Sequence, residues 1–140
     1  MAEALLRVAL PQTSLWCVSS AGLAAFEGSR ASEFAVAALN ELGCDLRIHR
    51  SRQVTAEHIR KASAIVPMTN AHTYQLTTQF PDARDRIYLL SSFDPAAPAN
   101  ADVTDPFCGT LDDYRRCRDV IRRAIPGLVR FLEQTDSSDC

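Results

Sequence analysis

The order of elements along the chain predicts a single α/β domain with a mostly parallel β-sheet. Short apolar runs alternate with segments of helical periodicity, which is the pattern of strand–helix–strand units. The 140 residues are 46% hydrophobic, so the chain can bury one core without disulfides or a structural metal. No internal repeat or low-complexity tract points to another architecture.

The first two helices are predicted from their end signals. Residues 2–10 are rich in strong helix formers and stop at Pro11, although no N-cap is visible for the first turn. Ser32 is expected to cap a helix over residues 33–42. Gly43 suits the left-handed residue that ends such a helix.

Two shorter helices are predicted in the middle of the chain. Thr55 is expected to cap residues 56–62. Asn70 is expected to cap residues 71–79, and Pro81 closes that helix because proline cannot continue it.

The last helix is predicted to start in an imperfect capping box, Thr110-Leu111-Asp112-Asp113. Pro126-Gly127 falls inside its apolar stripe, so a kink or break is expected there. The stripe consists of Tyr114, Cys117, Ile121, Ile125, Leu128 and Leu132. Residues 1–134 are therefore expected to form one domain, with residues 135–140 as a disordered tail.

Three short apolar runs are predicted to be strands: Leu15–Val18, Ala64–Met68 and Arg86–Leu90. Pro67 is expected at the end of the second strand, since proline cannot donate to a ladder. Residues 91–105 are predicted to be a long loop, and such loops in compact domains are usually functional or disordered.

Composition argues against several classes of function. The formal net charge of -2 does not suggest nucleic acid or a membrane surface as a partner. Five cysteines without CxxC spacing and three histidines without ligand spacing indicate neither a disulfide framework nor a metal site. Glu3 and Arg7 do not fit a secretory signal, and no apolar run is long enough to span a bilayer. We therefore expect a cytoplasmic protein with reduced thiols and no cofactor.

One loop carries a candidate catalytic group. Asp105-Pro106-Phe107 presents a carboxyl group on a proline-stiffened turn just ahead of the last helix. Cysteine-dependent cleavage of a phosphomonoester needs such an acid to protonate the leaving oxygen and then to act as a base toward water. It also needs a thiolate in a ring of backbone amides and an arginine that clamps the phosphoryl oxygens. Taken alone, Asp105 is better explained as a turn residue.

Taken together, five segments resemble the low-molecular-weight protein phosphatase family, and the resemblance extends over residues 1–132. Their order and spacing are jointly hard to obtain by chance. In chain order they are Val18–Gly22, Arg50–Thr55, Ile65–His72, Phe80–Ala83 and Asp105–Phe107.

The resemblance implies a fold similar to phosphotyrosine phosphatase I, a three-layer sandwich in which helices flank a short, mostly parallel sheet. It implies that Asp105 is the general acid and base, that Phe107 lines the pocket mouth, and that the Ser20 hydroxyl supports the phosphate-binding loop. Substrates in the family are phosphorylated proteins. Phe107 followed by a small residue and Gly109 is more similar to the bacterial branch that includes arginine-phosphate phosphatases than to tyrosine-specific members.

The sequence departs from the family at its start. Residues 1–7 match the helix that follows the family's Cys-x5-Arg loop, so that loop and the first, central strand of the sheet would precede residue 1. Cys44 and Arg50 have the required spacing, but the segment between them has no glycine. We reject this pair, because an anion-binding nest of backbone amides needs conformational freedom.

Three hypotheses about function stay open. The chain as written is a catalytically inactive member of the family, an N-terminally truncated reading of an active cytosolic protein tyrosine or arginine phosphatase, or a non-catalytic binding module. Loss of the central strand is expected to leave two sheet edges with unpaired backbone groups. Thiol-coupled arsenate reduction is disfavoured, because residues 69–92 contain no cysteine.

Overall fold

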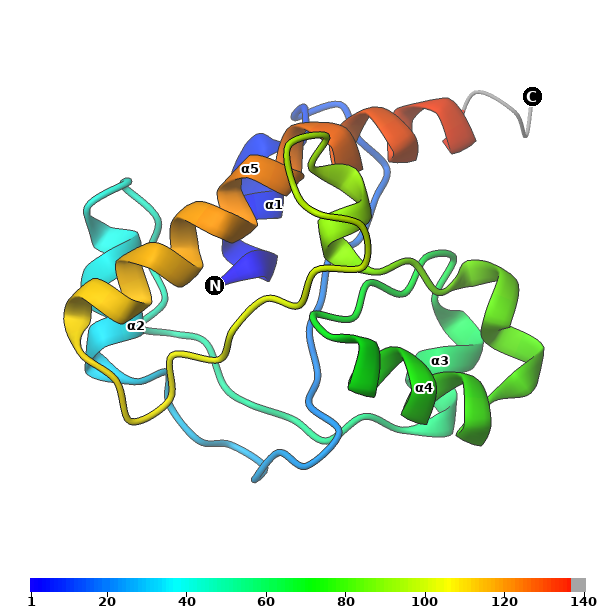
Figure 1. Cartoon of the computed structure of the whole chain (residues 1–140), viewed down its shortest axis with the longest axis horizontal. Helices are drawn as coiled ribbons and strands as arrows, with labels where there is room; N and C mark the ends of the chain where they lie inside the picture. Colours follow the sequence, from blue (N-terminus) through cyan, green and yellow to red (C-terminus); the bar gives the residue numbers. More distant parts are fainter. Residues whose placement is uncertain (137–140) are drawn as a thin grey trace.

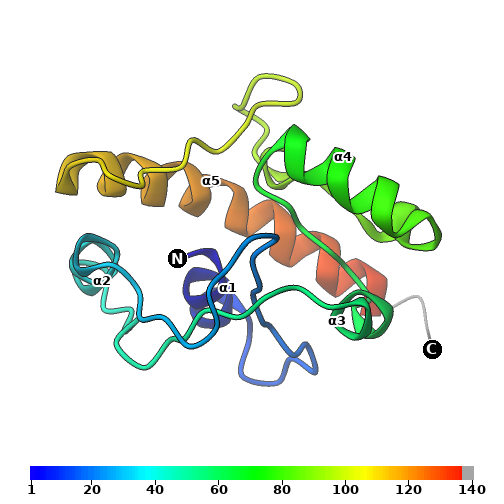
Figure 2. The same ribbon diagram turned by 90° about the horizontal axis from the view of Figure 1, so that it is seen from below.

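The computed structural model describes residues 1–136. The longest helix, α5 (Leu111–Asp136), crosses the whole molecule, and α1, α2 and η2 pack against it (Figure 1). The group formed by α3, α4 and η1 lies at the end of the molecule opposite α2 (Figure 2). The remaining bounds are α1 (Ala2–Ala9), α2 (Glu33–Asn40), α3 (Ala56–Lys61), α4 (Asn70–Gln79) and the 3-10 helices η1 (Pro81–Arg86) and η2 (Leu90–Phe93).

The main core lies between α5 and the elements that cover it. All six residues of the predicted α5 stripe are buried, so the inward face of this helix is confirmed. Leu39 of α2 and Leu90 of η2 are almost completely buried, and each such side chain contributes roughly 1.5–3 kcal/mol. A smaller core holds α3, α4 and η1 together and consists of Ile59, Leu76 and Ala83.

The residues predicted to end α2 and to start α2 and α3 are found where expected, whereas the cap of α4 differs by one residue. Ser32 Oγ accepts from the Ala35 amide at 3.2 Å, and Thr55 forms a capping box with His58. Gly43 follows α2 with a φ of +73°. The predicted cap Asn70 is wrong by one residue: Thr69 caps α4, and Asn70 is its first helical residue. Sequence alone did not separate two adjacent residues that are both able to cap.

The start of α5 is capped as predicted. A kink or break was expected at Pro126-Gly127, and the break is wrong because the helix is continuous there. Thr110 Oγ1 accepts from the Asp113 amide at 3.3 Å, while Asp113 Oδ2 accepts from the Thr110 amide at 2.7 Å. The helix continues through Pro126 to Asp136. Proline removes one helical hydrogen bond, and the buried stripe, which continues on both sides of residue 126, holds both halves of the helix against the same core.

Gly127 has a packing role that explains its place in the helix. A Cβ at this position would overlap the Phe93 carbonyl oxygen and lie 3.0 Å from its carbon. The missing side chain therefore lets the backbone of η2 lie directly on α5.

The three predicted strands are not assigned as strands within residues 1–136. Residues 65 and 87 form an isolated parallel bridge, with Ile65 donating to the Arg86 carbonyl at 2.7 Å and Tyr88 donating to the Ile65 carbonyl at 2.9 Å. Leu90 continues the pattern by donating to the Pro67 carbonyl at 3.0 Å. The ladder stops because Pro67 has no N–H to return the next bond.

Residues 15–18 alternate between exposed and half-buried side chains, but no other backbone segment pairs with them in the part of the chain described. The Trp16 amide donates to Ser14 Oγ at 3.2 Å, and the Val18 carbonyl accepts from Arg7. The elements around the expected sheet are thus present, whereas the parallel sheet, its three layers and the missing central strand stay predictions.

Candidate active site

The loop that carries Asp105 begins at Asp94, of which only 7% is exposed. Asp94 Oδ2 accepts from Arg123 Nε of α5 at 3.2 Å, and Oδ1 accepts from the Ala96 amide at 2.9 Å. A buried carboxylate is stable only when it is paired. These two bonds therefore fix the start of the loop to the middle of α5.

A second anchor joins the loop to the N-terminus of α4. Asp102 Oδ1 accepts from both the amide and the side chain of Asn70, each at 2.7 Å, and the Asn100 carbonyl accepts from Asn70 Nδ2 at 2.7 Å. Asn100 has a φ of +57°, which asparagine tolerates better than most residues. One residue on, the Val103 amide donates to the Met68 carbonyl at 2.9 Å. The loop is thus fixed two residues before Asp105.

Asp105 is exposed and lies between this anchor and the start of α5. Its Oδ1 accepts from the Phe107 amide at 2.9 Å, which is an Asx turn, and its other oxygen has no partner among residues 1–136. Phe107 is 77% exposed, and Cys108 has a φ of +62°. The turn therefore uses one oxygen of the carboxyl group and leaves the other without a hydrogen bond in the described chain.

Ser20 is bonded to α1. Its hydroxyl donates to Glu3 Oε2, and its carbonyl accepts from Arg52 Nε at 2.8 Å. Glu3 is 11% exposed in its side chain and also pairs with Arg7 at 2.8 Å, while His49 Nδ1 lies 3.7 Å from Glu3 Oε2. The predicted loop-supporting serine thus lies beside the first turn of α1.

The start of α1 interacts electrostatically with the region of Asp105. Burial lowers the pKa of the Met1 amino group, and the nearby Cys117 and Glu3 raise it. Burial also raises the pKa of the Cys117 thiol, which the Met1 amino group lowers and the Asp105 carboxylate raises. No side chain caps α1. The Met1 amino group and the Asp105 carboxylate thus act on the same buried thiol, Cys117 of α5, with opposite effects on its pKa.

Neither of the two described cysteines that have an arginine six residues downstream forms a nucleophile site. Cys44 is buried with its thiol 3.9 Å from the Leu42 carbonyl, and Arg50 donates to carbonyls of its own turn, so the rejection of this pair is confirmed. Cys117 and Arg123 have the same spacing, but both lie inside α5. Helical amides are already bonded within the helix and cannot surround a phosphoryl group.

The other expected absences concern metals and membranes. Within residues 1–136, no three side chains of the His, Cys, Asp and Glu types gather where a metal ion could bind. None of the helices described combines the length and the apolar character needed to cross a membrane.

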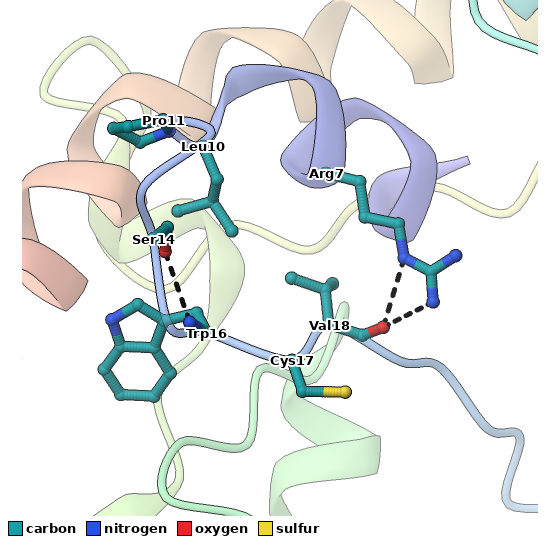
Figure 3. A pocket seen from close by; sticks show the side chains of 7 residues that line it. All are labelled: Arg7, Leu10, Pro11, Ser14, Trp16, Cys17 and Val18. Carbon is teal, nitrogen blue, oxygen red and sulfur yellow. Dashed lines mark hydrogen bonds between the residues drawn. The ribbon is translucent and has the colours of Figure 1, made fainter.

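A cavity of about 320 Å³ lies at the C-terminal end of α1, where Arg7, Trp16 and Val18 line it (Figure 3). Arg7 closes one wall by donating to the Val18 carbonyl through Nε at 3.2 Å and Nη2 at 2.6 Å. None of the predicted site residues lines this cavity. It is therefore separate from the Asp105 region.

The structure adds residues that sequence reasoning did not assign to the site. Glu3, Asp94 and Asp102 position the predicted site residues or their loop through hydrogen bonds. An Asp-Pro pair at residues 94–95 was the available signal for the first loop anchor, but nothing local indicated that its partner is Arg123.

Comparisons of the sequence and of the structure with known proteins find the same group of relatives over nearly the whole chain. The pattern of the low molecular weight phosphotyrosine protein phosphatase family matches residues 1–138. A protein-arginine-phosphatase of Geobacillus stearothermophilus is 37% identical over 116 residues, covering 83% of this chain and 76% of the relative. Its counterpart in Bacillus subtilis is 32% identical over 135 residues, covering 96% and 88%. The solved structure of the YwlE arginine phosphatase from Geobacillus stearothermophilus superposes with a TM-score of 0.84 at 36% identity, covering 98% of this chain and 86% of that chain.

Proposed function

Because the chain belongs to the low molecular weight phosphotyrosine protein phosphatase family, we propose that it forms the larger part of a protein phosphatase in which Asp105 is the general acid and base. The observation that carries this proposal is the position of Asp105. It lies on a loop that Asp94 anchors to α5 and Asp102 anchors to the N-terminus of α4.

In the proposed reaction, Asp105 protonates the leaving atom of the substrate in the first step. It then removes a proton from water, which cleaves the phospho-enzyme in the second step. Phe107, which is largely exposed beside the acid, contacts the organic part of the substrate. Ser20 supports the phosphate-binding loop through its position beside the first turn of α1.

The substrate we propose is a phosphorylated residue of a protein, with phosphoarginine favoured over phosphotyrosine. Phe107-Cys108-Gly109 supports this preference, as do two relatives whose names describe arginine phosphatases. The leaving atom is then the guanidinium nitrogen. Phosphate release from matched phosphoarginine and phosphotyrosine peptides distinguishes the two, and faster release from the phosphotyrosine peptide would contradict the preference.

A polypeptide of only these 140 residues is proposed to be inactive. None of its cysteines opens a Cys-x5-Arg loop: Cys108, just ahead of α5, is followed six residues on by Tyr114 rather than an arginine, so no ring of amides with an arginine clamp holds the phosphoryl oxygens. Loss of even one oxyanion donor typically costs a factor of about a hundred or more in rate. Such a chain should release no phosphate from either peptide.

A second candidate is that the natural reading frame supplies the missing loop in a cytosolic enzyme. The resemblance supports it, because residues 1–7 match the helix that follows the Cys-x5-Arg loop in the family. Strand and loop together need roughly 17 residues. Sequencing the corresponding DNA upstream of Met1 tests this idea directly, and an in-frame stop codon with no Cys-x5-Arg segment would remove it.

If that segment exists, the extended chain should be active and depend on Asp105. Replacing a general acid typically lowers the rate by a factor of about 10²–10⁴. Asp105→Asn in the extended chain should therefore reduce kcat by this factor, whereas Asp82→Asn, an exposed control on η1, should not. Equal rates for the parent and Asp105→Asn would show that another group is the acid.

A further inference from the structure

Residues 22–31 and 46–55 lie side by side along the edge of the molecule away from α5 (Figure 1). We call this pair of segments the arginine ribbon. Two isolated bridges join them, Arg30 to Arg50 and Gly22 to Gln53. Backbone bonds of 2.8–2.9 Å hold them together, among them Gly28 to the Ser51 carbonyl and Ser51 to the Ser29 carbonyl.

The ribbon is strongly basic in a chain whose net charge is -2. Its two segments contain four arginines and one glutamate. The glutamate, Glu27, accepts from the Gln53 amide at 2.7 Å, and Arg47 pairs with Asp45 at 2.8 Å. Within residues 1–136, the other three arginines of the ribbon have no carboxylate at salt-bridge distance; they are Arg30, Arg50 and Arg52.

Arg30 and Arg50 face each other directly. They are the two members of the antiparallel bridge, and both are exposed. Opposite residues of such a pair project to the same side, and like charges placed there repel. Arg50 holds its guanidinium in place by donating from Nη1 to the carbonyls of Arg47 and His49, at 3.0 and 2.7 Å. By this rule the pair is unfavourable in the free chain, and an anion bound beside both side chains would offset the repulsion.

Large apolar side chains flank the arginines. Phe26 and Ile48 are each 85% exposed. Aromatic residues and arginine are enriched in the contact surfaces of proteins. A free phosphate ion would use only the charges, whereas a polypeptide with acidic residues would use both the charges and the apolar groups.

We infer that the arginine ribbon binds an acidic segment of the phosphoprotein substrate. Arg52 connects the ribbon to the predicted site, because its Nε donates to the Ser20 carbonyl at 2.8 Å. An acidic segment on the ribbon would therefore lie beside Ser20, which the proposed function assigns to the support of the phosphate-binding loop. The role in substrate choice rests on the proposed function, but binding itself needs no turnover.

The test measures binding of a fluorescent peptide of alternating glutamate and serine to the 140-residue chain by fluorescence anisotropy at low ionic strength. Arg30→Glu removes one cation and allows Arg50 to pair with the new carboxylate. Because exposed ion pairs are weak, we expect between about twofold and tenfold weaker binding. Arg30→Lys should retain most of the affinity, and salt should weaken binding by the parent chain.

Arg84→Glu is the matched control, because it makes the same charge change at an exposed residue of η1, outside the ribbon. It should bind the peptide like the parent. Arg30→Glu should also be at least as resistant to urea as the parent, since it replaces a repulsion with an attraction. The inference is overturned if the parent does not bind the peptide, or if Arg30→Glu and Arg84→Glu weaken binding equally. Absence of phosphatase activity in an extended chain would refute the proposed function and leave this binding result intact.

Discussion

Gly127→Ala tests whether the contact between η2 and α5 fixes the start of the acid loop. In an exposed helix this substitution would be favourable, because alanine is better than glycine by about 1 kcal/mol. Here the new methyl group would overlap the Phe93 carbonyl oxygen. This oxygen and its carbon belong to the backbone, so they cannot rotate away as a side chain could. The predicted change in stability therefore has the opposite sign.

The neighbours of Phe93 decide how large the effect is. Its ring packs on Phe131 with centroids 5.4 Å apart, and the next residue, Asp94, is bonded to Arg123. The carbonyl cannot move away without disturbing these contacts. Overpacking of this kind typically costs 1–3 kcal/mol, and part of it is offset by helix propensity. We expect a net loss of about 1–2 kcal/mol in the free energy of unfolding.

Urea unfolding followed by circular dichroism measures this difference through the transition midpoint. Arg130→Ala is the control, because it adds an alanine at an exposed position of the same helix and should change stability by less than about 0.5 kcal/mol. If Gly127→Ala is as stable as the parent or more stable, η2 does not lie on α5 as described, and the first anchor of the acid loop is misplaced.

Three other substitutions test separate parts of the account. Asp102→Ala should speed hydrogen exchange at residues 103–109, measured by mass spectrometry, because it removes the bonds to the start of α4; unchanged exchange would mean that this anchor is not needed. Hydrogen bonds from Arg115 and Arg118 lower the pKa of Glu41 from 4.5 to about 2, so its stabilising effect is present above pH 4.5 and is lost as the pH falls toward 2. Glu41→Gln should make the urea midpoint less sensitive to pH in that window, and an identical pH dependence would contradict the pairing. Arg118→Gln should cost about 2 kcal/mol in urea unfolding, because this buried guanidinium donates to the Ala38 carbonyl at 2.8 Å; a change below about 0.5 kcal/mol would contradict that role.

Helices were predictable because their signals are local. The α5 stripe repeats at helical spacing, and Ser32, Thr55 and Thr110 each accept from the amide three residues further on. The error at Asn70 has the same origin, since Thr69 offers an equally good oxygen one residue earlier.

Strands were less predictable because pairing depends on distant residues. Residues 64–68 and 86–90 do approach each other as expected, but Pro67 ends the ladder after one bridge. Residues 15–18 have an apolar pattern and no backbone partner in the described chain. An apolar run indicates burial, whereas a strand requires a second segment at the correct distance.

The candidate site was predictable only where one residue acts with its neighbours. Asp105 and its turn could be identified from Pro106 and Phe107. The anchors of that loop join residues 29 and 32 positions apart, Asp94 to Arg123 and Asn70 to Asp102. No local pattern predicts such pairs. The continuity of α5 through Pro126 likewise depends on the packing of both its halves.

The most direct test of the central claim is the release of p-nitrophenol from p-nitrophenyl phosphate by the purified 140-residue chain, compared with its Asp105→Ala variant. The account predicts that both release p-nitrophenol no faster than buffer, because the acid has no thiolate to assist. Release by the parent that is lost in Asp105→Ala, together with a phosphorylated cysteine trapped on the chain, would contradict it.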